Sequence, residues 1–497
     1  MGLGVLTLED LIRALAVSQG QLPEKWPAGP PPQVEIHSAV IDSRLASPGC
    51  LFIALRGEQH DGHDFVGAAI DQGAVAIIAE RRPSSACTVL TTADWGSAIV
   101  DWPPASPVCI LVPDSLVALQ RVAAYWRRQN AVRIIGITGS VGKTTSKEAI
   151  AAVLRQRYNT LKSGGNYNNE IGLPLTLLAL TTSHERVVLE MGMYDLGEIA
   201  LLAEIALPQV GVVTNVGPTH LERLGTIERI AQAKAELPQA LPPAEEGGVA
   251  ILNADDEWVG TMASQTRARI FTYGLSPQAD LWADSIESEG LEGLRFRFHY
   301  GEETVYARVP MLGHHSVHTA LRAAAVGLVE GLSWQEIMVG LRDQTAQLRL
   351  VAVPGPAGST ILDDTYNASP TSCIAALNLL EELAPHEGGG RKIAVLGDMY
   401  ELGAYQEEGH KIVGRRARDA ADVLVAVGRL GRIIGQEALK VGMPAGSVYL
   451  VETNAQAIDL LRTLVTPSPA GDKILIKGSR GMAMEEIVTA LQEGEVS

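Results

Sequence analysis

One stretch decides the fold of this chain: Ile135-Gly136-Ile137-Thr138-Gly139-Ser140-Val141-Gly142-Lys143-Thr144-Thr145. An apolar run leads into a glycine-containing loop, and a segment with a helical pattern follows the loop. Backbone N–H groups at Gly139 and Gly142 can close on phosphate oxygens, and the N-terminus of the next helix adds partial positive charge. The order strand, loop and helix around Gly-Lys-Thr-Thr therefore predicts a nucleotide-binding loop.

In such a loop, the ammonium of Lys143 neutralises the β- and γ-phosphates, and the hydroxyl of Thr144 coordinates Mg²⁺. The strict spacing of the motif requires glycine at position 137, where this chain has isoleucine. A glycine-bearing turn without a ligand is the alternative, and the surrounding strand and helix favour the nucleotide. The residues expected to contact it are Gly139, Ser140, Val141, Gly142, Lys143, Thr144 and Thr145.

Outward from the loop, strand-like apolar runs alternate with helical patterns. This alternation predicts an α/β fold with mostly parallel sheets that are covered on both faces. We expect three domains, 1–113, 114–343 and 344–497, with Pro-rich stretches at 27–32 and 101–107. The expected strands are 39–42, 51–55, 75–79, 108–112, 133–138, 187–190, 210–215, 249–253, 360–363, 392–396, 423–427 and 473–476, and the clearest helices are 116–128, 316–328 and 334–341.

Composition excludes several classes of protein. The chain has 497 residues, 46% hydrophobic and 20% charged, which is the profile of globular domains and not of a disordered chain. A net charge of −17 disfavours binding to nucleic acid or to an anionic membrane. Four scattered cysteines fit a reducing compartment, and the sequence shows neither a basic leader nor a long apolar run. We expect a soluble, cytoplasmic monomer without membrane insertion.

Several further segments resemble the Mur ligases, which are ATP-dependent amino-acid ligases of peptidoglycan precursor synthesis. The phosphate loop lacks the first glycine as theirs does, and the match continues in order through all three regions. The closest resemblance is to the branch that adds D-alanyl-D-alanine to UDP-N-acetylmuramoyl-tripeptide, because the DNPR motif of the diaminopimelate- or lysine-adding branch is absent. The segments are Gly165-Asn166-Tyr167-Asn168-Asn169-Glu170-Ile171-Gly172-Leu173-Pro174, Asp364-Thr365-Tyr366-Asn367-Ala368-Ser369-Pro370, Leu396-Gly397-Asp398-Met399-Tyr400-Glu401-Leu402-Gly403 and Lys477-Gly478-Ser479-Arg480.

The resemblance implies a fold and a reaction. The fold is a small N-terminal α/β domain for the UDP end, a central ATPase domain, and a C-terminal Rossmann-like domain that closes over ATP. The reaction uses ATP to turn a carboxylate into an acyl phosphate, which the amine of D-alanyl-D-alanine then attacks. Two alternatives stay open at this point: a Mur-type ligase for another acid and amine, and a nucleotide-binding relative without ligase activity.

The resemblance also implies a metal centre with two Mg²⁺ ions. Glu190 ends an apolar strand and bridges the ions, while His220 and a carbamylated Lys234 support the second ion. Carbamylation turns an ammonium that would repel a metal into an anion. The alternatives are a strand-terminal surface acid for Glu190 and a solvated helix face for Lys234.

The resemblance also implies substrate contacts in the N-terminal and central regions. Asn168 and Asn169 suit a peptide substrate, although a Gly/Asn-rich loop also makes plain turns. Ser43 and Arg44 are candidates for the UDP moiety, with a salt-bridged surface turn as the alternative for Arg44.

In the C-terminal region, Arg349 and Asp364 match the arginine and aspartate with which the family closes over ATP. The resemblance implies that Arg349 meets a phosphate and that Asp364 meets the ribose hydroxyls. The glycine that often precedes this arginine is missing, since the chain reads Gln347-Leu348-Arg349. The second-rank contacts for the amine substrate are Tyr366, Asn367 and Lys477.

The main departure from the family pattern is Gly313-His314-His315-Ser316-Val317-His318-Thr319-Ala320. Relatives usually show HNVxNA here, and their second asparagine contacts adenine. Thr319 offers one hydroxyl where an amide offers an acceptor and two donors. Either adenine selectivity is looser or neighbouring residues hold the base. A metal site at the three histidines is disfavoured, since no carboxylate pattern supports it.

Overall fold

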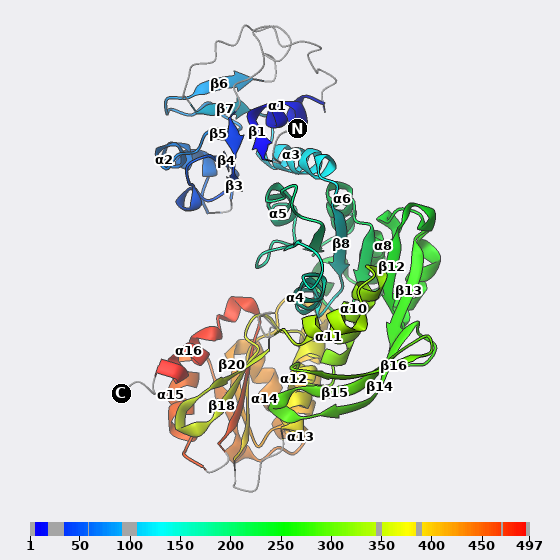
Figure 1. The fold of residues 1–497 in the computed structure, drawn as a ribbon. Coiled ribbons are helices and arrows are strands. Elements are labelled where there is room, and N and C mark those ends of the chain that lie inside the picture. Colours follow the sequence, from blue (N-terminus) through cyan, green and yellow to red (C-terminus); the bar gives the residue numbers. More distant parts are fainter. Residues whose placement is uncertain are drawn as a thin grey trace. The chain divides into compact units, whose positions relative to one another are not determined.

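The computed structural model describes residues 5–17, 34–57, 59–91, 107–343, 350–383, 390–468 and 471–493 (Figure 1). The chain divides into two compact units. The first comprises Met1–Gly136, Tyr158–Met193 and Gly197–Gln209, and the second comprises Ile137–Arg157, Tyr194–Leu196 and Val210–Ser497. Within the described ranges, no helix is both long and apolar enough to cross a membrane.

The first unit contains a five-stranded parallel sheet with the order β3-β4-β5-β7-β6. Every residue of β4 and β5 is buried, as expected for parallel strands that are covered on both faces. A short antiparallel pair, β1 and β2, lies outside this sheet. The elements are β1 (Leu6–Thr7), α1 (Leu8–Val17), β2 (Glu35–Ile36), β3 (Ser38–Val40), β4 (Cys50–Ile53), α2 (Val66–Asp71), β5 (Ala76–Ala79), β6 (Thr88–Thr91), β7 (Val108–Leu111) and α3 (Ser115–Gln129).

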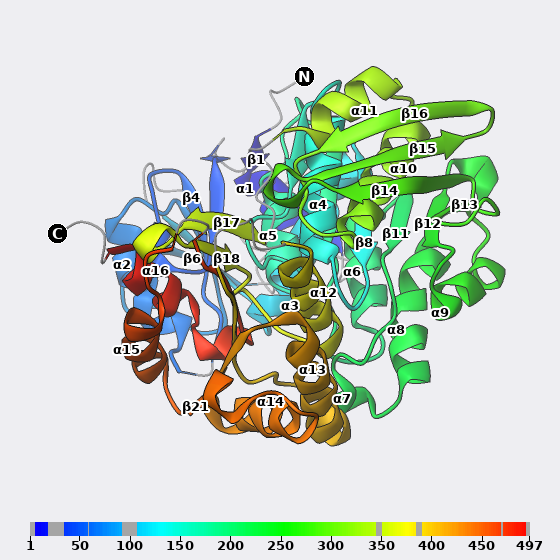
Figure 2. The same ribbon diagram turned by 90° about the horizontal axis from the view of Figure 1, so that it is seen from below.

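A nine-stranded sheet has the order β16-β15-β14-β13-β12-β11-β8-β10-β9. Its strands are β8 (Arg133–Thr138), β9 (Thr160–Lys162), β10 (Arg186–Glu190), β11 (Val210–Val213), β12 (Val249–Asn253), β13 (Arg269–Gly274), β14 (Leu281–Ser288), β15 (Leu294–Tyr300) and β16 (Glu303–Val309). The pairs β9–β10, β11–β12, β12–β13 and β13–β14 are parallel, whereas β14, β15 and β16 run antiparallel (Figure 2).

The associated helices are α4 (Lys143–Leu154), α5 (Gly172–Leu178), α6 (Glu198–Ala206), α7 (Leu221–Leu224), α8 (Ile227–Ala240), α9 (Glu257–Thr261), α10 (Ser316–Val329) and α11 (Trp334–Leu341). Helix α11 has the predicted bounds, α10 ends one residue later than predicted, and α3 extends one residue further at each end.

A six-stranded sheet near the C-terminus has the order β17-β18-β22-β19-β20-β21, and only β17 is antiparallel. Alternate strand residues face opposite sides: Leu362 and Leu475 pack with α12–α14, whereas Ile361 and Ile474 pack with α15 and α16. This doubly wound arrangement agrees with the prediction. The elements are β17 (Val351–Pro354), β18 (Thr360–Asp363), α12 (Pro370–Glu382), β19 (Lys392–Leu396), α13 (Gln406–Ala420), β20 (Val423–Val427), α14 (Gly428–Lys440), β21 (Val448–Val451), α15 (Asn454–Leu464), β22 (Lys473–Lys477) and α16 (Glu485–Glu493).

The predicted alternation of strands and helices fails at β13–β16, where four strands follow one another. The period-two burial in β15, with Leu294, Phe296 and Phe298 buried and Arg295 exposed between them, is the signal that could have identified an antiparallel strand. The Pro-rich stretch 27–32 lies outside the described residues, as does the stretch 101–106.

Candidate functional site

The phosphate loop connects β8 to α4, and the segment after β11 holds it in shape. Asn215 Oδ1 accepts a hydrogen bond from the backbone of Val141 at 2.9 Å, and Asn215 Nδ2 donates to the carbonyl of Val141 at 2.9 Å. Thr214 Oγ1 donates to the same carbonyl at 2.7 Å. Ser140 Oγ donates to the carbonyl of Gly217 at 3.0 Å and accepts from its N–H at 2.8 Å. The loop is therefore fixed by side chains before any ligand arrives.

Two glycines of the loop have conformations that other residues rarely adopt. Gly139 has φ of +144°, and a Cβ at this position would overlap Oγ1 of Thr214. Gly142 has φ of +86° and is the N-cap of α4. A backbone that approaches this closely, at a helix N-terminus, is the cradle that phosphate groups require.

We expect Gly139→Ala to weaken the affinity for a nucleoside diphosphate by at least about tenfold, because the methyl group must displace Thr214 and strain the backbone. Isothermal calorimetry measures this affinity directly. Gly217→Ala is the matched control in the same loop cluster, since its Cβ would meet nothing closer than Ser140 Cβ at 3.7 Å. Equal affinities of the two variants would contradict this account of the cradle.

Two lysine side chains lie near the loop. Lys143 Nζ donates to the carbonyl of Gly139 at 2.8 Å. Lys234, on α8, is only 2% exposed, so the solvated helix face considered for it is wrong. Burial first, and the ammonium of Lys143 second, hold the pKa of Lys234 well below its ordinary value. Among the described residues no carboxylate forms an ion pair with Lys234, and this buried amine is thus biased toward its neutral, nucleophilic form.

His220 lies beside the LGDMYELG segment. Its Nδ1 is 2.9 Å from Oε2 of Glu401, outside hydrogen-bond alignment, and its ring meets that of Tyr194 edge-on at 5.3 Å. Pairing with His220, with smaller contributions from Arg223 and Lys143, holds the pKa of Glu401 below its ordinary value. Both His220 and Glu401 have positive φ. Sequence reasoning identified His220 but assigned no role to Glu401.

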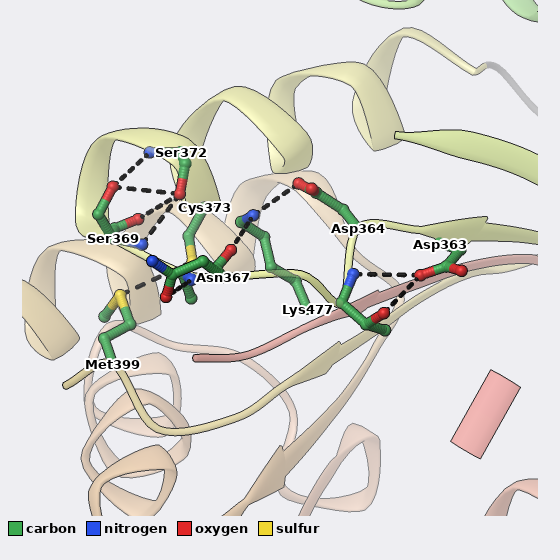
Figure 3. A network of polar contacts seen from close by, with 10 residues as sticks. Asp363, Asp364, Asn367, Ser369, Ser372, Cys373, Met399 and Lys477 are labelled. Carbon is green, nitrogen blue, oxygen red and sulfur yellow. Dashed lines mark hydrogen bonds and ion pairs between the residues drawn. The ribbon is translucent and has the colours of Figure 1, made fainter. Parts of the chain in front are cut away.

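The carboxyl ends of β18 and β22 carry an ion pair between a buried lysine and a partly buried aspartate (Figure 3). Lys477 Nζ lies 2.6 Å from Oδ2 of Asp364 and also donates to the carbonyl of Asn367 at 2.8 Å. The side chain of Lys477 is 2% exposed and that of Asp364 13% exposed. The structure thus brings three predicted residues together, and Tyr366 lies beside them with the guanidinium of Arg480 5.8 Å from its ring centre.

Arg349 is the one predicted ATP contact that the structure does not place. It lies in the segment 344–349, outside the described residues, so its expected contact with a phosphate is not tested. Its predicted companion Asp364 is described, and the ion pair with Lys477 holds its carboxylate at the end of β18. The contact of Arg349 with a phosphate therefore stays a prediction from the resemblance.

In the first unit, Glu190 is 1% exposed, so the surface acid considered for it is wrong. Asn168 Nδ2 donates to Oε1 of Glu190 at 3.0 Å. Asn169 has a different role, because its Oδ1 accepts from the backbone of Gly172 at 2.9 Å, at the start of α5. Asn168 therefore orients a buried carboxylate, whereas Asn169 stabilises the turn that leads into α5.

In the same unit, Ser43 and Arg44 occupy a short 3₁₀ turn. Ser43 is buried, while the Arg44 side chain is 86% exposed and pairs with Asp42 at 2.6 Å. This geometry favours the salt-bridged turn for Arg44.

The segment that departs from the family pattern forms the start of α10. Thr319 is 4% exposed on this helix. His314 pairs with Glu382 and His318 with Asp255, and no group of three metal-ligating side chains occurs within the described ranges. His314 and His318 are thus each engaged with a different carboxylate.

Asp398, a polar residue at a strand end, has a structural role. It caps α14 by accepting hydrogen bonds from the N–H groups of Leu430 and Gly431 at 2.9 and 2.8 Å.

The sequence assigned no role to several residues that hold the loop in place. Asn215 had a detectable signal, because it follows a buried strand whose carboxyl end faces the loop. Ser146, Tyr273 and Arg322 had no local signal: they are far apart in the sequence, and only the fold brings them together.

A loop of this geometry on an α/β sheet defines a P-loop nucleotide-binding protein. Family models match three parts of the chain: the Mur ligase family, catalytic domain at 35–127, the Mur ligase middle domain at 137–327, and the Mur ligase, glutamate ligase domain at 348–480. The chain is 39% identical to the UDP-N-acetylmuramoyl-tripeptide--D-alanyl-D-alanine ligase of Bacillus subtilis (strain 168), covering 94% of this chain and 95% of that protein. It is 34% identical to the protein of the same name from Escherichia coli (strain K12), over 93% and 94% of the two chains.

A crystal structure of MurF from Acinetobacter baumannii superposes with a TM-score of 0.80 at 31% identity, covering 99% of this chain and 100% of that one. MurF ligase from Thermotoga maritima in complex with ADP gives a TM-score of 0.73 at 27% identity, covering 92% and 97%. The chain belongs to the Mur ligase family. The resemblance drawn from the motifs and the predicted three-part α/β fold are both confirmed.

Proposed function

We propose that this chain is an ATP-dependent ligase that joins D-alanyl-D-alanine to UDP-N-acetylmuramoyl-tripeptide. The observation that carries the proposal is near full-length similarity, at 30–39% identity, to relatives that bear this ligase's name. The cradle at Gly139 and Gly142 and the pre-formed contacts of Asn215 support a triphosphate in the loop. A binder without ligase activity would have no need of a buried Lys234 close to Lys143 that has no carboxylate partner among the described residues.

The chemistry follows from the poor reactivity of a carboxylate. The tripeptide carboxylate attacks the γ-phosphorus of ATP, the bond to the β-phosphate oxygen breaks, and ADP leaves. The amine of D-alanyl-D-alanine then attacks the acyl carbon, loses a proton, and expels inorganic phosphate. Lys143, the loop amides and α4 stabilise the transferred charge, and domain closure excludes water.

The residues fit Mg²⁺ bound mainly through nucleotide phosphates and water. This ion usually takes only one or two protein oxygen ligands in such sites. The hydroxyl of Thr144 and the carboxylate of Glu190 would supply them, and Asn168 orients Glu190. When bound, the ion neutralises charge on the phosphoryl group. We propose that His220 and carbamylated Lys234 support a second ion.

Further roles remain part of the proposal. Asp364 meets the ribose hydroxyls and Arg349 a phosphate, while Ser43 contacts the UDP end. Tyr366 and Asn367 lie on the side of the amine substrate. The domain boundaries are 1–113, 114–343 and 344–497. Four free thiols, Cys50, Cys87, Cys109 and Cys373, support a cytoplasmic location.

Phosphate release tests the function. Purified protein with Mg²⁺ and ATP should release phosphate only when both UDP-N-acetylmuramoyl-tripeptide and D-alanyl-D-alanine are present, and mass spectrometry should find the lengthened product. Release with a different acid or amine would redirect the proposal to another Mur-type ligase. ATP binding without release under any combination would refute ligase activity.

A further inference from the structure

Arg322, on α10, is a buried cation behind the phosphate loop. Its side chain is reached by almost no solvent, since the residue is 4% exposed. Nε donates to Oγ of Ser146 at 2.7 Å, Nη2 to Oγ1 of Thr319 at 3.0 Å, and Nη1 to the hydroxyl of Tyr273 at 3.4 Å. All three acceptors are neutral hydroxyl oxygens, so they satisfy the N–H groups without offsetting the charge.

The guanidinium also lies close to the backbone of the loop at Gly142. A Cβ added at Gly142 would lie 3.2 Å from Nη2 of Arg322. Ser146 relays the contact, because its Oγ accepts from Arg322 and donates to the carbonyl of Gly142 at 2.6 Å. Through Ser146, Arg322 is therefore connected to Gly142, the N-cap residue of α4. Gly142 is one of the two glycines that shape the cradle.

Within the described part of the chain, the charge of Arg322 has no carboxylate partner. Its guanidinium lies 5.8 Å from the ring centre of Tyr273, which is a cation–π contact with a neutral ring. A guanidinium stays protonated in proteins, and a buried charge without a counter-ion is costly. No carboxylate in the described ranges forms an ion pair with it, and the ammonium of Lys143 adds further positive charge at the loop. A bound anionic ligand is one way to balance such a charge.

We infer that Arg322 is a positioning residue for the phosphates of the bound nucleotide: it braces Gly142 through Ser146 and supplies buried positive charge that only the polyphosphate offsets. The inference rests on the proposed function. It also gives a reason for threonine at position 319, where the family usually has an adenine-binding asparagine. The hydroxyl of Thr319 accepts a hydrogen bond from Arg322 and so helps to hold the guanidinium in place.

Calorimetric affinities for adenosine, AMP and ADP test the inference. Arg322→Met should weaken ADP about tenfold, which is about 1.4 kcal/mol, weaken AMP less, and leave adenosine within about twofold. Arg322→Lys, which keeps the charge, should recover most of the ADP affinity. Without nucleotide, Arg322→Met should melt no lower than the parent protein, because Ser146 and Tyr273 keep other hydrogen bonds and an unpaired buried charge is removed.

Arg127→Met is the matched control. Arg127 is another buried guanidinium, 6% exposed, but it donates to the carbonyls of Ala206 and Asn130 in the first unit. Its removal should leave the ADP affinity unchanged. Equal weakening of adenosine and ADP by Arg322→Met, or no weakening of ADP, overturns the inference. Failure of the parent protein to bind any adenine nucleotide would instead refute the proposed function.

Discussion

Lys234→Ala should lose ligase activity by about 100-fold or more, and short carboxylic acids such as acetate or formate should restore part of it. Under the proposed function, the neutral amine of Lys234 attacks CO₂, forms a carbamate and releases a proton, which places a negative charge at a position where the unmodified amine has none. In the alanine variant a small carboxylate can enter the vacated space and supply the missing negative charge. Steady-state rates with increasing acetate measure the rescue.

Lys147→Ala is the matched control for the rescue. Lys147 is also fully buried, at 1% exposure, but it has a carboxylate partner, Glu148, at 3.4 Å. Its removal should lower stability, yet added acetate should not raise its activity. A Lys234→Ala enzyme that keeps full activity, or a parent enzyme whose Lys234 never carries the added mass of a carboxyl group under bicarbonate, would refute the carbamate.

The direction in which pH changes ligase activity follows from the lowered pKa of Lys234. Because the pKa of Lys234 is lowered, acid is needed to protonate the amine, and protonation reverses carbamylation. Activity lost after incubation at low pH without CO₂ should therefore return faster at neutral pH when bicarbonate is added.

The sequence was informative where function depends on local order. The run from Ile135 to Thr145 predicts strand, loop and helix, because each residue type there has a local reason: glycines for positive φ, lysine and threonine for phosphate and metal. Residues at strand ends, such as Glu190 and Asp364, were also identifiable, since parallel strands bring their carboxyl ends to one edge.

Contacts between distant segments were not predictable. Nothing around Arg322 distinguishes it from a solvated helix arginine, and its burial depends on Tyr273 and Ser146 from separate elements. Lys234 is similar: its position in a helical pattern predicts exposure, and only the packed fold buries it. The antiparallel strands β14–β16 were not predicted for another reason. Their signal is a period-two pattern of burial, and the alternation of strands with helices does not include it.

Lys477→Met should lower the free energy of unfolding, by at most about 3–5 kcal/mol, because it leaves the partly buried carboxylate of Asp364 uncompensated. The double variant Lys477→Met/Asp364→Asn should recover part of this loss, since no unpaired charge remains. Urea denaturation of the parent, both single variants and the double variant gives the coupling energy of the pair. Lys473→Met is the control on the same strand, where Nζ donates to the hydroxyl of Thr360 at 3.1 Å.

The same double variant separates stability from nucleotide recognition. If Asp364 accepts from the ribose, the double variant should regain stability but keep a raised KM for ATP, and it should lose the parent's preference for ATP over 2′-deoxyATP. Lys477 then acts by holding Asp364 in place, with the carbonyl of Asn367 as its second anchor. An unchanged preference in the double variant would show that Asp364 does not contact that hydroxyl. A Lys477→Met variant no less stable than Lys473→Met would mean that the ion pair contributes nothing to the fold.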